Sequence, residues 1–157
     1  MVNSKVMSKA GYDKIMTQIS EIEEEISLTE KKMGESVKRD NDLRENPEFL
    51  ELRVKVMYTL PIKKKELLDI AKNAIILEET EEYKDFDGLK VIIGSKVVLT
   101  IDGEEEELTI MGYGEADWDN NIISYEAPMA QAILGKHVGD VVKFNSLEIC
   151  IKAISRK

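Results

Sequence analysis

The sequence has few of the residues that bind metals or form disulfides. Among its 157 residues there is one cysteine, Cys150, and one histidine, His137. A single cysteine excludes a disulfide within the chain, and a lone histidine with no cysteine beside it argues against a zinc site. Cys150 lies in an alternating segment, so we predict that its side chain lies in a core.

Positive charge and long apolar runs are also scarce. The 22 lysines and arginines are outnumbered by 31 acidic residues, which gives a net charge of −9. Binding to duplex nucleic acid needs a dense field of basic side chains, so a basic protein surface is the better candidate partner. No stretch approaches the roughly 18 apolar residues of a membrane span, and the N-terminus lacks a signal peptide's apolar core. We therefore expect a cytoplasmic protein with no membrane partner.

The first half of the chain has apolar residues at the spacing of coiled-coil helices. They recur every three or four positions in two series, so we predict two long amphipathic helices, the first with Ser8 as its N-cap. Helices of this kind with a short connection should pair antiparallel. The predicted seam is Tyr12, Ile15, Ile19, Ile22, Ile26, Met33 and Val37, with Thr29 filling a gap, and then Leu50, Val54, Met57, Pro61, Lys64, Leu68, Ala71 and Ile75.

Two residues of the second series do not suit a helical seam. Pro61 lacks a backbone N–H and should kink the helix locally, and Lys64 must snorkel or lie off the seam. Antiparallel pairing would bring the acidic residues near 21–25 close to the lysines at 63–65. The alternative is a solvated charged face on each helix, because exposed ion pairs add little stability.

The second half of the chain changes to the period of two that is typical of strands. A polar stretch at residues 78–87 separates the halves, and Asp102 with Gly103 marks a hairpin turn. We predict strands at residues 96–101, 107–111, 121–125, 141–144 and 147–154, and a short helix at residues 129–134. The predicted fold class is α+β with two domains: an antiparallel α-helical coiled-coil hairpin at residues 1–79, and an antiparallel sheet with one short helix at residues 80–157.

The connection between the two predicted helices carries the residues of greatest chemical interest. Asn46 and Pro47 form a helix start, with Asn as N-cap and Pro at the first helical position. Asp42 and Glu45 therefore lie in the connecting turn. Two carboxylates three residues apart in a turn can converge on one Mg²⁺ ion, which often takes only one or two protein carboxylates. Acidic residues are also ordinary at turns and helix starts, so a purely structural role stays open.

Several stretches of the sequence together resemble the bacterial Gre family (GreA/GreB) of transcript-cleavage factors. They are NDLRENPEF at residues 41–49, IGSKVVL at residues 93–99, ISYEAPMAQAILGK at residues 123–136 and GDVV at residues 139–142. Their order and spacing fit nearly the whole chain. By this resemblance the second domain has an FKBP-like fold, which does not by itself imply prolyl isomerase activity.

The resemblance implies a role in transcription. The C-terminal domain of such a factor docks at the rim of the secondary channel of RNA polymerase, and the coiled coil enters the channel. Asp42 and Glu45 would then act as catalytic carboxylates that hold a second Mg²⁺, shared with the polymerase active site, for cleavage of backtracked RNA near the nascent 3′ end. The isolated factor would bind no cofactor, would not itself be an enzyme, and is expected to be a monomer.

The same resemblance assigns roles to the residues around these carboxylates. Leu43, Arg44, Asn46 and Glu48 would shape the tip, and Lys38 and Arg53 would contact RNA or line the channel. For the two basic residues a solvated coiled-coil face is the alternative.

The chain departs from the family pattern at several positions. Asn41 stands where Gly is usual and Pro47 where Ala is usual, and both residues suit the local backbone. Ala127 and Gln131 replace a usual Ser and Arg near the C-terminal helix, which bears on polymerase contacts. Pro61 has no family rationale.

Three other functions stay open from the sequence. A Gre-like regulator would occupy the same channel and inhibit or modulate transcription without promoting cleavage. A coiled-coil adaptor would pair its helical seams between chains. A prolyl isomerase would turn over proline-containing peptides.

Overall fold

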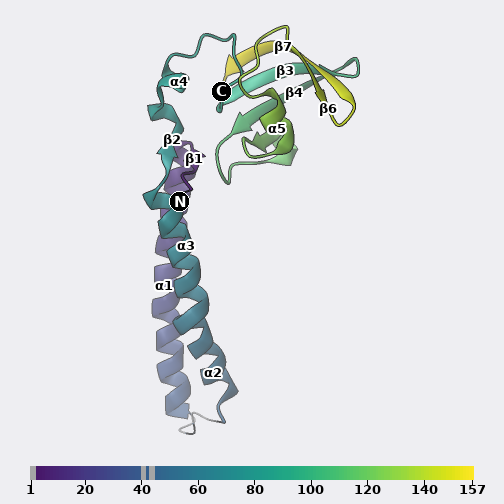
Figure 1. The fold of residues 1–157 in the computed structure, drawn as a ribbon. Coiled ribbons are helices and arrows are strands. Elements are labelled where there is room, and N and C mark those ends of the chain that lie inside the picture. The colour runs from purple at the N-terminus through teal and green to yellow at the C-terminus, as the bar shows by residue number, and fades with distance from the viewer. Residues whose placement is uncertain (1–2, 40–41, 43–44) are drawn as a thin grey trace. The chain divides into compact units, whose positions relative to one another are not determined.

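The computed structural model describes residues 3–39, 42 and 45–157, and the chain forms two compact units. One is the helical segment Asp13–Asn73; the other combines Ala74–Lys157 with the N-terminal residues up to Tyr12. Helices fill the first unit and a sheet dominates the second, so the predicted α+β class is confirmed (Figure 1). No helix in the described part of the chain is both long and apolar enough to cross a membrane.

The helical unit is a hairpin of two arms (Figure 1). α1 (Lys9–Arg39) is one arm, and the other consists of α2 (Pro47–Val54), the π-helical turn η1 (Lys55–Thr59) and α3 (Leu60–Lys72). The inner face of α1 buries Ile15, Ile19, Ile22, Thr29 and Ser36. The predicted seam of this arm is therefore confirmed over most of its length, with Ser36 buried where Val37 was predicted.

Ion pairs across the hairpin show that its arms are antiparallel. Lys55 Nζ lies 2.5 Å from Glu25 Oε1, and Lys64 Nζ lies 2.8 Å from Glu23 Oε1. The predicted approach of opposite charges is thus confirmed. Lys64 is half-buried and keeps its ammonium group at the surface on Glu23, which is the snorkelling expected of a lysine near an apolar seam.

The seam of the returning arm differs from the prediction. Leu50, Val54, Met57 and Leu68 are between 42% and 53% exposed, whereas Leu60 is 4% exposed. The prediction is therefore wrong at these four exposed positions, whereas Pro61, Lys64 and Ala71 of the same series are partly buried.

The π turn explains the shift in the seam. The N–H of Leu60 bonds to the carbonyl of Lys55, so this hydrogen bond reaches one residue further back along the chain than that of an α-helix. Phe49 and Val56 are partly buried in the same arm. Phe49, Val56 and Leu60 thus each lie one position before a predicted seam residue.

Pro61 accounts for the position of the π turn. In a regular α-helix its ring would clash with the carbonyl of Met57, and it has no N–H to donate. The π turn ends at Thr59, and α3 resumes with Pro61 in its first turn. The structure thus has a π turn directly before the position at which a kink was predicted.

The second unit is built on a five-stranded sheet with the order β5-β4-β3-β7-β6. Its strands are β3 (Ser95–Ile101), β4 (Glu104–Met111), β5 (Ile122–Ser124), β6 (Val141–Phe144) and β7 (Leu147–Arg156). The pairs β3–β4, β3–β7 and β6–β7 are antiparallel, but β5 runs parallel to β4. The sheet is therefore mostly antiparallel, and β5 is the parallel exception because the chain crosses back over residues 112–121 before β5 begins.

The core of this unit lies between the sheet and α5 (Pro128–Ile133), the predicted short helix. Its aliphatic side chains with 0% exposure are Val97, Leu99, Ile110, Ile133, Ile149 and Ile151. Because side chains alternate along a strand, Cys150 points to the opposite face of β7 and is only half-buried. The prediction that Cys150 lies in the core is therefore wrong.

The predicted turn at Asp102 and Gly103 is confirmed. Both residues have positive φ, 49° and 88°, between the paired strands β3 and β4. Two-residue hairpin loops with positive φ at both positions match the right-handed twist of strands. The turn residues therefore set the register of this hairpin.

The N-terminal segment belongs to the sheet unit rather than to the helical one. β1 (Val6–Met7) pairs in parallel with β2 (Ile75–Ile76), and the N–H of Tyr113 donates to the carbonyl of Val6 at 2.7 Å. Met7 is completely buried, and a Cβ on Gly112 would lie 2.4 Å from the Met7 Cα. Glycine is required there because the two backbones touch.

Glu115 fastens the same segment. Its carboxylate accepts from the Ser8 N–H at 3.0 Å, from the Gly112 N–H at 3.2 Å, and from the Ser8 hydroxyl. Ser8 in turn caps the first turn of α1, accepting from the Gly11 N–H at 3.0 Å, as predicted. Residues before Tyr12 thus group with the sheet, which differs from the predicted boundary between residues 79 and 80.

The polar stretch at residues 78–87 is folded rather than an open linker. It contains the end of η2 (Leu77–Glu79) and all of α4 (Glu81–Lys84), and Thr80 caps α4. Leu77 is 4% exposed. The buried Leu77 and the cap residue Thr80 give this charged segment a fixed conformation. Neither role was predicted from the charges of the segment.

Candidate functional site at the hairpin tip

The hairpin tip lies between the end of α1 at Arg39 and the start of α2 at Pro47. Asp42 and Glu45 are both exposed there. The Glu45 N–H donates to the Asp42 carbonyl at 3.2 Å, which places the two residues at the ends of one tight turn. The other two predicted tip residues within that turn, Leu43 and Arg44, lie outside the described residues.

Asn46 links this turn to both arms of the hairpin. Its Oδ1 accepts from the Phe49 N–H at 3.0 Å, which confirms the predicted N-cap of α2. Its Nδ2 donates to Ser36 Oγ at 2.9 Å and to the Ser36 carbonyl at 3.3 Å. Asn46 and Ser36 are 5% and 1% exposed, so these bonds are shielded from water.

An exposed ion pair also crosses the tip. Arg39 Nη2 lies 2.8 Å from Glu48 Oε2, with 66% and 53% of the two side chains exposed. Glu48 was predicted to shape the tip, and the structure brings it to Arg39. Because both groups are well solvated, the pair contributes little to stability.

Sequence reasoning did not single out Ser36 or Arg39. A signal for Ser36 was present, because strict alternation of three and four from Thr29 through Met33 leads to position 36 rather than 37. A serine at an apolar seam position would have indicated a polar partner across the hairpin. Arg39 has no comparable signal, since a basic residue near a helix C-terminus is common.

The two predicted RNA-contacting residues lie on different arms. Lys38 is exposed in the last turn of α1. Arg53 is exposed on α2, and its Nε donates to Met57 Sδ at 3.4 Å. Both leave basic side chains on the surface of the hairpin near its tip.

The donor set of the tip suits part of a magnesium site. Asp42 and Glu45 could supply carboxylate oxygens, which Mg²⁺ prefers, while the remaining positions would be filled by water or by a partner's groups. The described residues contain no group of three or more His, Cys, Asp or Glu side chains that could hold a metal.

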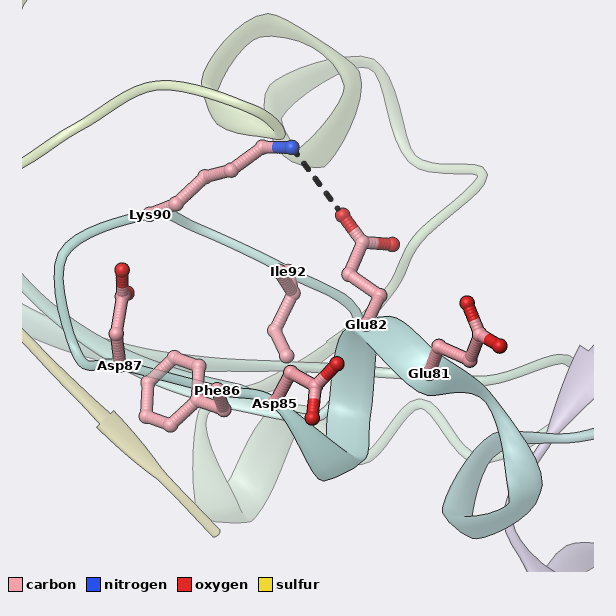
Figure 2. A pocket seen from close by; sticks show the side chains of 7 residues that line it. All are labelled: Glu81, Glu82, Asp85, Phe86, Asp87, Lys90 and Ile92. Carbon is pink, nitrogen blue, oxygen red and sulfur yellow. Dashed lines mark ion pairs between the residues drawn. The ribbon is translucent and has the colours of Figure 1, made fainter.

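A hollow lies on the sheet unit beside α4. It has a volume of about 190 Å³ and is lined by Glu81, Glu82, Asp85, Phe86, Asp87, Lys90 and Ile92. Figure 2 shows Lys90 reaching across it to Glu82, with 3.4 Å between Nζ and Oε1. One lysine among several acidic side chains is an ordinary solvated arrangement and points to no particular ligand.

Comparison with known proteins identifies the family. Residues 87–155 match the family model described as "Transcription elongation factor, GreA/GreB, C-term". A transcription elongation factor GreA from Nautilia profundicola is 32% identical over 146 residues, which cover 92% of this chain and 87% of that protein. The chain belongs to the GreA/GreB family of transcription elongation factors.

Two further comparisons cover all or nearly all of this GreA/GreB-family chain. The transcription elongation factor GreA of Geobacillus kaustophilus is 30% identical, and the alignment covers all of both chains. This alignment therefore includes the hairpin tip as well as the sheet. Among solved structures, the GreA factor homolog 1 (Gfh1) protein of Thermus thermophilus is 25% identical, with 98% of this chain and 99% of that chain covered and a TM-score of 0.43.

Proposed function

We propose that this GreA/GreB-family factor binds RNA polymerase and stimulates the polymerase's own cleavage of backtracked 3′ RNA. One observation carries the proposal: Asp42 and Glu45 are exposed and joined by a backbone hydrogen bond in one turn at the end of a helical hairpin. A pair held at a fixed spacing suits a task carried out in another molecule.

The hairpin gives these carboxylates reach. α1 has 31 residues, which corresponds to about 45 Å at about 1.5 Å per residue. An arm of that length can enter the secondary channel of the polymerase and bring the tip to the active site. The sheet unit, which carries the GreA/GreB family match, would dock at the rim of the channel.

The chemistry follows from an incomplete set of ligands. Asp42 and Glu45 would hold a second Mg²⁺ together with groups of the polymerase active site. When bound, that ion lowers the pKa of a coordinated water and offsets charge on the scissile phosphate. The carboxylates would orient this water toward the phosphate of the extruded RNA and keep its attack in line. Outside the complex the two side chains would bind Mg²⁺ weakly, so the factor alone is no enzyme.

The remaining parts of the hairpin have supporting roles in this proposal. Lys38 and Arg53 would contact the phosphates of the nascent RNA or the channel wall. The arms of the hairpin pair with each other within one chain, so the factor would act as a monomer. Because its target is RNA polymerase, it would work in the cytoplasm.

The test is RNA cleavage in a stalled, backtracked polymerase complex with Mg²⁺. Asp42→Asn and Glu45→Gln keep the shape of each side chain and remove its charge. We expect each variant to lower the stimulated cleavage rate by on the order of 100-fold, as loss of a charge-stabilising group in an active site does. Glu51→Gln, at an exposed acid on α2, is the control and should cleave at the parental rate.

The outcomes separate the competing functions. Equal cleavage by the parent and both tip variants would remove the catalytic role from these carboxylates. A parent that binds the complex and slows elongation without cleavage would instead be a channel-occupying regulator. A dimer by light scattering would favour the coiled-coil adaptor.

A further inference from the structure

Asn46 stands directly after Glu45 and touches both arms of the hairpin. Its carbonyl oxygen caps α2 through the Phe49 N–H at 3.0 Å, and its amide nitrogen bonds to Ser36 Oγ at 2.9 Å on the last turns of α1. The same nitrogen lies 3.3 Å from the Ser36 carbonyl. One side chain therefore fixes the end of α1 relative to the start of α2 and to the turn between them.

The position of Ser36 makes this bond unusual within the hairpin. Nearer the other end of α1, the same inward-facing stripe consists of Ile15, Ile19 and Ile22. A serine at such a position gives up apolar burial, and its hydroxyl, at 1% exposure, has to find a partner. Buried polar pairs in coiled-coil seams fix register, because every slipped arrangement leaves their polar groups unsatisfied.

We propose that Ser36 is a positioning residue for the tip carboxylates, acting through its hydrogen bond with Asn46. The bond sets the register of α2 against α1 and so holds the turn that carries Asp42 and Glu45. This inference rests on the proposed cleavage function for its activity readout. The exposed Arg39–Glu48 ion pair should contribute less than this bond to holding the turn, because water and salt screen it.

Two variants separate the Ser36–Asn46 bond from the helix cap. Ser36→Ala removes the hydroxyl and leaves Asn46 intact. Asn46→Ser keeps a residue that caps helices as well as asparagine does, but its side chain is too short to cap α2 and also reach Ser36. Ser27→Ala is the matched control, since Ser27 is an exposed serine on the same helix and gains the same helix propensity.

The first measurement uses the full-length protein alone. Amide hydrogen exchange by NMR reports on the Glu45 N–H, which bonds to the Asp42 carbonyl at 3.2 Å. We expect Ser36→Ala and Asn46→Ser to speed its exchange by roughly 5- to 10-fold, the effect of about one hydrogen bond, and Ser27→Ala to leave it unchanged. Unchanged Glu45 exchange in both test variants would overturn the proposal without any reference to polymerase.

The second measurement is cleavage of backtracked RNA across a range of factor concentrations. Misplaced carboxylates should lower the maximal rate by roughly tenfold, while the factor concentration at half-maximal rate stays at the parental value, because the surfaces that bind polymerase are unaltered. The double variant should be no slower than the slower single variant, since both changes remove the same bond. A weaker affinity for the polymerase complex with an unchanged maximal rate would overturn a positioning role. Strictly additive losses of rate in the double variant would overturn it as well.

The two measurements distinguish this inference from the function on which it rests. Faster Glu45 exchange in the variants, combined with a parent that fails to stimulate cleavage, would refute the cleavage function and support the fastening of the turn. Faster exchange combined with parental cleavage by both variants would refute the positioning role and leave the cleavage function standing.

Discussion

The sheet unit and the helical hairpin bury their apolar side chains in different ways. In the sheet unit, aliphatic residues from β3, β4, β7 and α5 form one continuous core with 0% exposure at its centre. In the hairpin, burial is confined to a narrow seam, and α1 buries Thr29 and Ser36 where isoleucines would continue the stripe. The seam thus becomes more polar toward the tip. The buried Ser36 hydroxyl bonds to Asn46 across the hairpin, whereas the buried Thr29 hydroxyl bonds to the Glu25 carbonyl of its own helix.

The returning arm adds a second contrast. Val54, Met57, Tyr58 and Ile62 are each more than 50% exposed along one side of this arm, while only Leu60 is fully buried. No comparable stripe of large apolar side chains lies along a strand of the sheet unit among the described residues. Exposed apolar side chains that gather in this way often mark a surface that contacts another molecule.

The largest expected effect is in the sheet core. Ile110→Ala should destabilise the sheet unit by about 3–4 kcal/mol, because it removes a fully buried side chain and leaves a cavity. Urea dependence of amide exchange in β3, β4 and β7 measures it. Val141→Ala, at a residue 56% exposed on β6, is the control and should change stability by less than about 0.5 kcal/mol.

A smaller effect is expected for the same substitution in the hairpin seam. Ile22→Ala should lower the free energy of unfolding of the hairpin by about 2 kcal/mol, because a two-helix seam can close partly around the lost atoms. Amide exchange in α1 and α3 measures the change. Leu28→Ala, at an α1 residue 58% exposed, should cost little. An Ile22→Ala loss as large as that of Ile110→Ala would contradict the contrast between a continuous core and a narrow seam.

A third prediction tests whether Glu115 holds the N-terminal segment on the sheet unit. Glu115→Ala leaves the Ser8 and Gly112 N–H groups without their acceptor and should destabilise this segment by about 1–2 kcal/mol. Faster exchange of the Met7 and Ser8 amides measures the loss. Glu105→Ala, at an exposed acid on β4, serves as the control. If both variants leave these amides unchanged, the segment is not fastened through Glu115.

The smallest expected effect concerns the ion pair between Glu25 and Lys55. The hydrogen bond from Lys55 lowers the pKa of Glu25 below its ordinary value. A carboxyl whose folded-state pKa is depressed adds stability above its unfolded-state pKa and loses that stability as the pH falls through the folded-state value. Lys55→Gln should therefore raise the pKa of Glu25 in an NMR titration. Its slight destabilisation at neutral pH should vanish in acid and shrink with added salt.

Local signals were predictable from the sequence, and long-range ones were not. The cap at Asn46, the turn at Asp102 and the seam of α1 depend on neighbouring residues, and each was located correctly. The phase of the returning arm was missed because its sequence offers two apolar stripes, and the π turn decides between them. The parallel placement of β5 and the fastening of residues before Tyr12 depend on partners far along the chain.

In the candidate site, too, local features could be predicted from the sequence and long-range contacts could not. The exposed carboxylates Asp42 and Glu45 could be proposed from a turn pattern and a family resemblance. Their attachment through Asn46 to Ser36 could not, since it joins residues on two arms whose register depends on the whole hairpin. The heptad position of Ser36 could have indicated a polar partner across the hairpin, but not that this partner is Asn46.

The most direct test of the central claim is the Mg²⁺ dependence of RNA cleavage in a backtracked polymerase complex. If Asp42 and Glu45 help hold the second ion, the parent should lower the Mg²⁺ concentration at half-maximal cleavage by about 10-fold or more relative to polymerase alone. Asp42→Asn and Glu45→Gln should abolish that shift, whereas Glu51→Gln should retain it. The same Mg²⁺ dependence for parent and both tip variants would contradict the account.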